Sequence, residues 1–327
     1  MSAPVQVARN AMATRFEIAL YGEDAVSLRA AAEEALDEVQ RLENQLSLYR
    51  PDSEISHLNA RASDEAVRVP PELFRLLEQA RRLHDETEGA FDITIGPLMR
   101  AWGFVADSGH LPDEKILEQA RQCVGMHHLQ LDPERQSVHF ARKSVMLDLG
   151  AIGKGYAIEK AAEILREAGV CSALIHGGTS TAVAIGCPPG EEAWKIAVER
   201  PPHPNPLPQW REGEPQRPLA VVPLRDNALS VSAVWGKSFQ SAGVTYGHVI
   251  DPRTGAPASK AVLAAVSVAS ATESDALSTA LLTLGIKGEA KIAKLRPGIR
   301  TLVVEQPEGP DEPLRVQSSG IKVREEF

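Results

Sequence analysis

Two short segments of the chain combine residue types that could bind an anion or a metal ion. The first is Asp148-Leu-Gly-Ala-Ile-Gly-Lys-Gly-Tyr156, which we expect to lie between a strand and a helix. Glycines let backbone amides approach a ligand, a helix N-terminus favours negative charge, and Lys154 could add a positive charge. The segment is neither a Walker A loop nor a GxGxxG motif. The pattern alone therefore supports a phosphate site and a simple glycine turn equally.

The second segment is Asp275-Ala-Leu-Ser-Thr279. Asp275 and Thr279 are four residues apart, so on a helix both side chains lie on one face. A carboxylate and a hydroxyl supply the hard oxygen ligands that Mg²⁺ prefers. The alternative is that Asp275 only caps the first helical turn, where negative charge is favoured, and the bare pattern favours this alternative.

Two further residues are candidates because of their surroundings. His248 comes just before the turn sequence Asp251-Pro-Arg-Thr-Gly255, at the end of an expected short strand. A lone histidine is usually structural, but one beside a loop on a rigid scaffold is a candidate base. Asp92 interrupts the β-rich run from Ala90 to Pro97. Such an aspartate must be paired, exposed or bonded to a ligand, and the spacing does not distinguish these.

The elements that position these residues indicate an α+β fold. Apolar spacing predicts strands at 14–21, 144–149, 170–176, 181–185, 194–198, 229–234, 247–250, 262–269 and 302–305. It predicts helices at 24–46, 71–86, 112–123, 156–168 and 273–284. Strands that follow strands outnumber βαβ units, so we expect antiparallel or mixed sheets with helices packed outside. Seven prolines in 201–218 predict an exposed, mobile insertion, because proline lacks the amide donor of a sheet ladder.

Composition excludes several classes of protein. The chain has 327 residues, enough for a large core without disulfides, and its three cysteines are widely spaced. The formal charge of −9 argues against a nucleic-acid partner. No apolar run reaches the roughly 20 residues of a membrane helix. The start MSAPVQVARN lacks the apolar region of a signal peptide, so the chain as written is expected to be cytoplasmic.

Six segments in order resemble the FAD:protein FMN transferase family, also called the ApbE family of flavin transferases. They are MATRFEI (12–18), LSLYRPDSEISHLN (46–59), GAFDITIGPLMRAWGF (89–104), LDLGAIGKGYAIEKA (147–161), GHVIDPRTGAP (247–257) and TESDALSTALLTLG (272–285). The resemblance covers about residues 12–305 and implies one ApbE-like unit, 1–327, of two intertwined lobes. Many members are exported lipoproteins, whereas this chain shows no lipid-bearing cysteine near its start.

The resemblance implies an enzyme that splits FAD at its pyrophosphate with Mg²⁺. The FMN half would pass to a threonine or serine hydroxyl of an acceptor flavoprotein through a phosphoester bond, and AMP would leave. Two alternatives remain open. One is a Mg²⁺-dependent FAD pyrophosphatase that gives FMN and AMP, and the other is an FAD-binding protein without turnover.

The resemblance also implies roles for single residues. Metal ligands would be the side chains of Asp275 and Thr279 and the main-chain oxygens of Ser278 and Ala151. His248 would help to deprotonate the acceptor hydroxyl. FAD would lie in a cleft between the N-terminal part and the 150–155 turn. Its expected contacts are Met12, Tyr49, Ala90, Phe91, Asp92, Asp148, Lys154 and Ile250.

Overall fold

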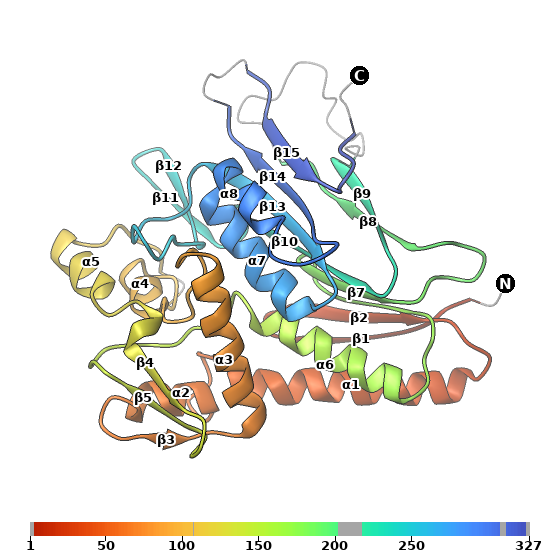
Figure 1. The fold of residues 1–327 in the computed structure, drawn as a ribbon, viewed down its shortest axis with the longest axis horizontal. Helices are drawn as coiled ribbons and strands as arrows, with labels where there is room; N and C mark the ends of the chain where they lie inside the picture. Colours follow the sequence, from red (N-terminus) through yellow and green to blue (C-terminus); the bar gives the residue numbers. More distant parts are fainter. Residues whose placement is uncertain (1–2, 107, 202–217, 308–311, 325–327) are drawn as a thin grey trace.

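An eight-stranded antiparallel sheet runs through the centre of the molecule (Figure 1). The computed structural model describes residues 3–106, 108–201, 218–307 and 312–324. The strand order is β1-β2-β6-β7-β10-β13-β14-β15, and every neighbouring pair is antiparallel. The bounds are β1 Val5–Ala11, β2 Thr14–Leu20, β6 Ala173–Gly177, β7 Thr181–Ile185, β10 Asn227–Ala233, β13 Ala261–Val268, β14 Arg300–Glu305 and β15 Arg315–Ser319. The predicted α+β class with antiparallel sheets is confirmed.

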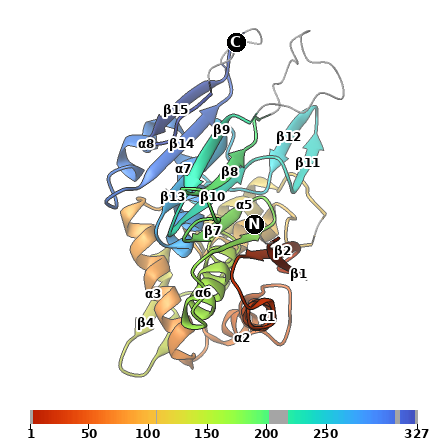
Figure 2. The same cartoon turned by 90° about the vertical axis from the view of Figure 1, so that its right-hand side faces the viewer.

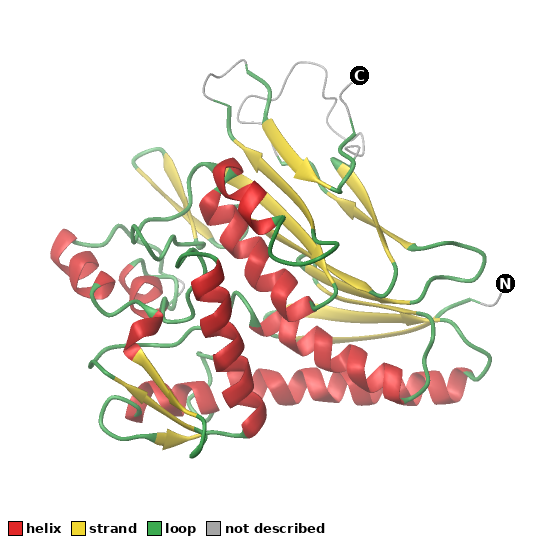
Figure 3. Cartoon of the chain, in the orientation of Figure 1, coloured by secondary structure: helices red, strands yellow, loops and turns green. Residues whose placement is uncertain are grey.

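Different elements cover the two faces of this sheet. Helices α1 (Ala25–Leu46), α6 (Gly153–Glu167) and α7 (Ala271–Leu284) pack on one face, and Figure 3 shows them gathered on one side of the strands. The hairpin of β8 (Trp194–Val198) and β9 (Ala220–Leu224) covers the other. Strand β13 is buried along its whole length because both of its faces are covered. Ala264 belongs to the helix-side core, for example, and Leu263 to the hairpin-side core.

The segment between α1 and α6 forms a smaller subdomain beside the helices. It contains α2 (Glu54–Arg61), α3 (Pro71–Glu86), α4 (Gly96–Ala101), α5 (Glu114–Arg121) and a 3₁₀ turn (Met126–His128). Its three-stranded sheet has the order β3-β5-β4, with bounds Val67–Arg68, Ser137–Phe140 and Leu129–Asp132. The hairpin β11 (Ser238–Ser241) and β12 (Val244–Gly247) stands at one side of the molecule, and α8 (Ile286–Ile292) at the other (Figure 2).

Local sequence signals explain the elements that were predicted well. Asp24 caps α1, because its carboxylate accepts hydrogen bonds from the amides of Val26 and Ser27. An apolar stripe that includes Leu36 and Leu42 is fully buried along that helix. Helix α3 begins at Pro71 and ends at Glu86, as predicted.

Several predicted elements around the site were wrong. Residues 144–149 form no strand, because Met146 makes only an isolated bridge to Ile95 and the Leu147 amide donates to the side chain of Asn59. Residues 90–95 lie in turns rather than a strand, since the Asp92 carboxylate accepts from the Thr94 amide.

Two other boundaries also moved. Helix α6 begins at Gly153 instead of 156, and β12 ends at Gly247 instead of continuing to Ile250. The proline-rich insertion falls on residues 202–217, outside the described residues. Among the residues that are described, no helix has both the length and the apolar character to cross a membrane.

Candidate active site

A cavity of about 810 Å³ opens where the large sheet, the smaller subdomain and the segments that flank the β11–β12 hairpin meet. Its wall brings together residues from segments far apart in the sequence. The predicted site residues that line it are Tyr49, Ala90, Phe91, Asp92, Asp148, Ala151, Lys154, His248, Ile250, Asp275 and Thr279. Met12 and Ser278 do not line it. One cavity therefore joins the glycine turn, the Asp275 helix and the His248 loop.

Asp275 is held at the point where helices α6 and α7 cross. Its side chain lines the cavity although the residue is only 4% exposed. The Gly155 amide donates a hydrogen bond of 2.9 Å to Oδ2 of Asp275. A Cβ atom at Gly155 would overlap the Ala271 carbonyl oxygen and lie 2.6 Å from the Asp275 Cβ atom. Glycine is therefore required for this close approach, which brings the N-terminal turn of α6 against the carboxylate.

Three hydroxyl groups form a hydrogen-bonded cluster beside the main-chain carbonyl of Asp275. Thr279 Oγ1 and Ser278 Oγ donate to the Asp275 carbonyl oxygen at 3.3 and 3.0 Å. Ser232 Oγ, on β10, lies 2.8 Å from Ser278 Oγ and 3.2 Å from Thr279 Oγ1. Ser232 also lines the cavity, and the sequence interpretation did not include it. The alternation of Ser230 and Ser232 with apolar residues in this strand is the only sequence feature that could have indicated it.

The donor set at Asp275 fits a hard divalent cation. Asp275 and Thr279 supply side-chain oxygens, and Ala151 lines the same cavity. Ser278 is fully buried behind them. The described residues contain no cluster of three or more His, Cys, Asp or Glu side chains suited to a metal. A cation held by one carboxylate would keep a net positive charge, which suits an anionic substrate.

His248 is oriented as a base. Its Nδ1 atom lies 3.1 Å from the Lys237 carbonyl oxygen, which can only accept, so Nδ1 carries the proton and Nε2 has a free electron pair. Burial lowers the pKa of His248, the Lys237 carbonyl opposes this shift, and the charges of Lys154 and Lys237 add to it. The imidazole is therefore neutral at pH 7 and can take up a proton.

Positive and aromatic side chains also line the cavity. Lys154 Nζ donates to the Gly150 carbonyl at 3.4 Å, and Lys237 Nζ lies 5.5 Å from the centre of the Tyr49 ring. Tyr49 is 59% exposed, and an aromatic ring can stack on another ring system. Burial raises the pKa of Asp148, while its hydrogen bond from the Gly150 amide and the charges of both lysines oppose that shift.

The strip Ala90-Phe91-Asp92 forms a rigid wall of the cavity. The Ala90 carbonyl accepts from Thr283 Oγ1 of α7 at 3.1 Å, and the Phe91 amide donates to Thr87 Oγ1 at 3.2 Å. Oδ1 of Asp92 accepts from both the amide and the hydroxyl of Thr94, at 2.7 and 2.6 Å. These contacts tie the strip to α7 on one side and to the end of α3 on the other.

Met12 lies in the tight turn between β1 and β2. Met12 and Ala13 both have left-handed backbone angles, φ 49° and 57°, which non-glycine residues rarely adopt. The Met12 amide donates to the Glu43 carboxylate at 2.8 Å, and its side chain packs against the main core. Its expected contact with FAD stays a prediction.

Residues 12–303 match the sequence profile of the ApbE family. The chain belongs to the ApbE family. A relative from Treponema pallidum (strain Nichols), named FAD:protein FMN transferase, is 30% identical over 311 residues, covering 91% of this chain and 82% of the relative. A relative of the same name from Vibrio cholerae serotype O1 is 28% identical over 290 residues, and the match covers 88% of this chain and 82% of the relative.

Solved structures of ApbE proteins share this fold. The ApbE protein of Thermotoga maritima has a TM-score of 0.80 at 25% identity, covering 92% of this chain and 94% of that protein. The flavin transferase ApbE of Vibrio cholerae has a TM-score of 0.79 at 27% identity, covering 97% and 98%. The predicted family is thus confirmed, and the similarity extends over nearly the whole chain.

Proposed function

We propose that this ApbE-family chain is a Mg²⁺-dependent FAD:protein FMN transferase. The observation that carries the proposal is the presence of His248, Lys154 and the Asp275–Thr279 pair in one cavity of a chain whose relatives bear that name. The reaction moves the FMN half of FAD to a threonine or serine hydroxyl of an acceptor flavoprotein. The P–O–P bond breaks, a phosphoester O–P bond forms, and AMP leaves.

The metal site follows from the donor groups. Mg²⁺ would be held by the side chains of Asp275 and Thr279 and by main-chain oxygens of Ala151 and Ser278. When bound, the ion supplies a Lewis acid that offsets the charge of the pyrophosphate. Lys154 lies on the cavity wall and adds a second positive charge, which supports binding of an anionic dinucleotide by a protein of net charge −9.

His248 would receive the proton of the acceptor hydroxyl. Its free Nε2 atom and its lowered pKa give an unprotonated base at neutral pH. The exposed ring of Tyr49 would stack on one ring system of FAD, and the strip Ala90–Asp92 would contact the nucleotide. Asp148, Ile250 and Met12 complete the proposed FAD contacts.

Incubation with FAD and Mg²⁺, with and without a candidate acceptor flavoprotein, tests the proposal. Covalent flavin on the acceptor, followed by fluorescence in a denaturing gel, should appear together with AMP. A variant acceptor with valine in place of its modified threonine should stay unlabelled. FMN and AMP formed equally well without an acceptor would show a pyrophosphatase instead. Bound FAD that is never cleaved with any acceptor would show a binding protein.

A further inference from the structure

His84 lies directly behind the cavity wall without lining the cavity. It belongs to the last turn of α3, and its side chain is 21% exposed. Its Nδ1 atom lies 3.0 Å from the Phe91 carbonyl oxygen and 3.2 Å from Oδ2 of Asp92. Because both partners are acceptors, Nδ1 carries a hydrogen that the two oxygens share.

One of the two carboxylate oxygens of Asp92, Oδ2, lies against the imidazole of His84. The Asp92 side chain is 1% exposed, although the residue lines the cavity. Oδ1 is occupied by the amide and hydroxyl of Thr94, whose hydroxyl oxygen in turn accepts from the Gly125 amide at 2.7 Å. Oδ2 contacts His84 Nδ1 as an ion pair at 3.2 Å. The imidazole therefore fixes the plane of the carboxylate.

The same contact balances the charge of the buried carboxylate. A carboxylate with so little exposure is costly unless a positive group or several donors compensate it. Burial alone would lower the pKa of His84, but the hydrogen bond and charge of Asp92, the Phe91 carbonyl and the charge of Asp85 outweigh it, so the pKa is raised. Asp85 on its own helix and Asp92 on the facing strip are the charged groups that act on His84.

We propose that His84 is a positioning residue of the FAD site, whose Nδ1–H holds the Phe91 carbonyl and the Asp92 carboxylate in place for the nucleotide. An ionised carboxylate only accepts hydrogen bonds, so Asp92 would recognise a donor group on FAD, such as a ring N–H. The inference rests on the proposed function, because it assumes that FAD occupies this cavity.

The test compares FAD affinity in two substitutions of His84 between pH 6 and 9, measured by titration calorimetry without metal. His84→Leu removes the donor, and we expect FAD to bind about 10- to 100-fold more weakly at pH 7, as for loss of a hydrogen bond to a charged group. His84→Asn keeps a donor close to the Nδ1 position without the charge. We expect its affinity at pH 7 to stay within about 5-fold of wild type.

The pH profile separates positioning from a merely structural role. In wild type, FAD affinity should fall as pH rises through the pKa of His84, because Asp92 then loses its positive partner beside an anionic ligand. His84→Asn should lack this fall. His248, whose pKa is lowered, is present in both proteins, so its titration contributes equally to both profiles. His139→Leu and His139→Asn are the controls, because the ring of His139 contacts the Gln130 side chain at 3.2 Å and does not line the cavity.

The outcomes are distinguishable. Failure of the wild-type chain to bind FAD overturns the proposed function and this inference together. Wild-type binding with unchanged affinity in a folded His84→Leu overturns the role of His84 alone. If His84→Leu does not fold in a thermal melt, His84→Asn decides: a pH profile identical to that of wild type overturns the inference, and a flat one supports it.

Discussion

Asp275 is the residue on which the metal proposal depends. It supplies the only side-chain negative charge among the proposed ligands, so Asp275→Asn should lower Mg²⁺-dependent AMP release by at least about 100-fold. Asparagine retains an oxygen that can accept from the Gly155 amide, so circular dichroism should show a native fold. Thr279→Val should cost less, because water can replace a neutral oxygen ligand. Wild-type AMP release by Asp275→Asn would show that Asp275 only serves the start of its helix.

His248 should affect turnover rather than FAD binding. Its substitution by alanine removes the proposed base, so the rate of flavin transfer should fall by about 10²–10⁴-fold while the Kd for FAD stays nearly unchanged. The unprotonated ring is the active form. The wild-type rate should therefore fall only at acidic pH, as the pH drops through the lowered pKa of His248. A wild-type pH profile in His248→Ala would contradict the assignment.

The sequence could predict residues that act through a local motif, but not residues that act through a contact across the fold. Asp275 and Thr279 share a helix face, which spacing alone indicates. Ser232 reaches Thr279 from a strand 47 residues earlier, and only the packing of α7 on β10 brings them together. The role of His84 could not be predicted from the sequence, for a related reason. A histidine near a helix end has many ordinary roles until its partner Asp92 is located.

The crossing of α6 and α7 is the element-scale feature on which the cavity depends. Gly155→Ala places a methyl group against the Ala271 backbone, which cannot yield, so it should destabilise the protein by about 2–3 kcal/mol and displace Asp275. Gly153→Ala is a matched control on the same helix, since its nearest neighbour would be the Leu149 Cβ atom at 3.9 Å. It should change stability by less than about 1 kcal/mol. Urea unfolding of both variants checks this difference, and equal midpoints would contradict it.

Element boundaries were predictable where capping and apolar spacing agreed. Helix α1 has both Asp24 as its cap and a regular buried stripe. The segment 144–149 is not the predicted strand, because its apolar residues are buried without a neighbouring strand. Its Asp148 amide donates to the Ile93 carbonyl of a loop instead. Alternating apolar residues indicate burial, and they indicate a strand only when a partner edge is available.

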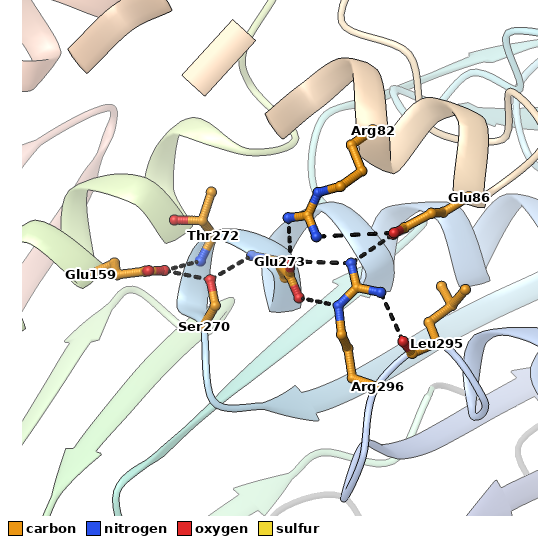
Figure 4. Close-up of polar contacts among 8 residues, drawn as sticks. All are labelled: Arg82, Glu86, Glu159, Ser270, Thr272, Glu273, Leu295 and Arg296. Carbon is orange, nitrogen blue, oxygen red and sulfur yellow. Dashed lines mark hydrogen bonds and ion pairs between the residues drawn. The ribbon is translucent and has the colours of Figure 1, made fainter. Parts of the chain in front are cut away.

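At the scale of the whole molecule, an ion-pair network ties the smaller subdomain to the helix that carries Asp275 (Figure 4). Glu273, in the first turn of α7, accepts from Arg82 of α3 at 2.6 Å and from Arg296 at 2.9 Å. Arg296 also reaches Glu86 of α3 at 2.7 Å. On the other side, Glu159 of α6 accepts from Ser270 Oγ and the Thr272 amide, both at 2.7 Å. The start of α7 is thus fixed by α3, by α6 and by the segment after α8.

Loss of the Glu273 charge should weaken this junction in a pH-dependent way. The Glu273 side chain is 9% exposed, so Glu273→Gln removes the buried carboxylate that two arginines share, leaves them only Glu86, and should cost about 3 kcal/mol at pH 7. Burial would raise the pKa of Glu273, but Arg296 and Arg82 outweigh it and the pKa is lowered from 4.5. The stability that it contributes is therefore fully present above pH 4.5 and is lost as pH falls through the lower folded value.

Urea unfolding from pH 7 down to pH 3 measures the stability that the Glu273 carboxylate contributes. The difference in unfolding free energy between wild type and Glu273→Gln should close as the pH falls. Glu118→Gln is the control, because Glu118 is 56% exposed and contacts Arg121 at 3.3 Å and Gln122 at 3.4 Å on the surface of its own helix end. Its effect should stay below about 0.5 kcal/mol at every pH, as for an exposed pair. A gap for Glu273→Gln that stays constant with pH would mean that packing, and not the ionised carboxylate, holds α3 to α7.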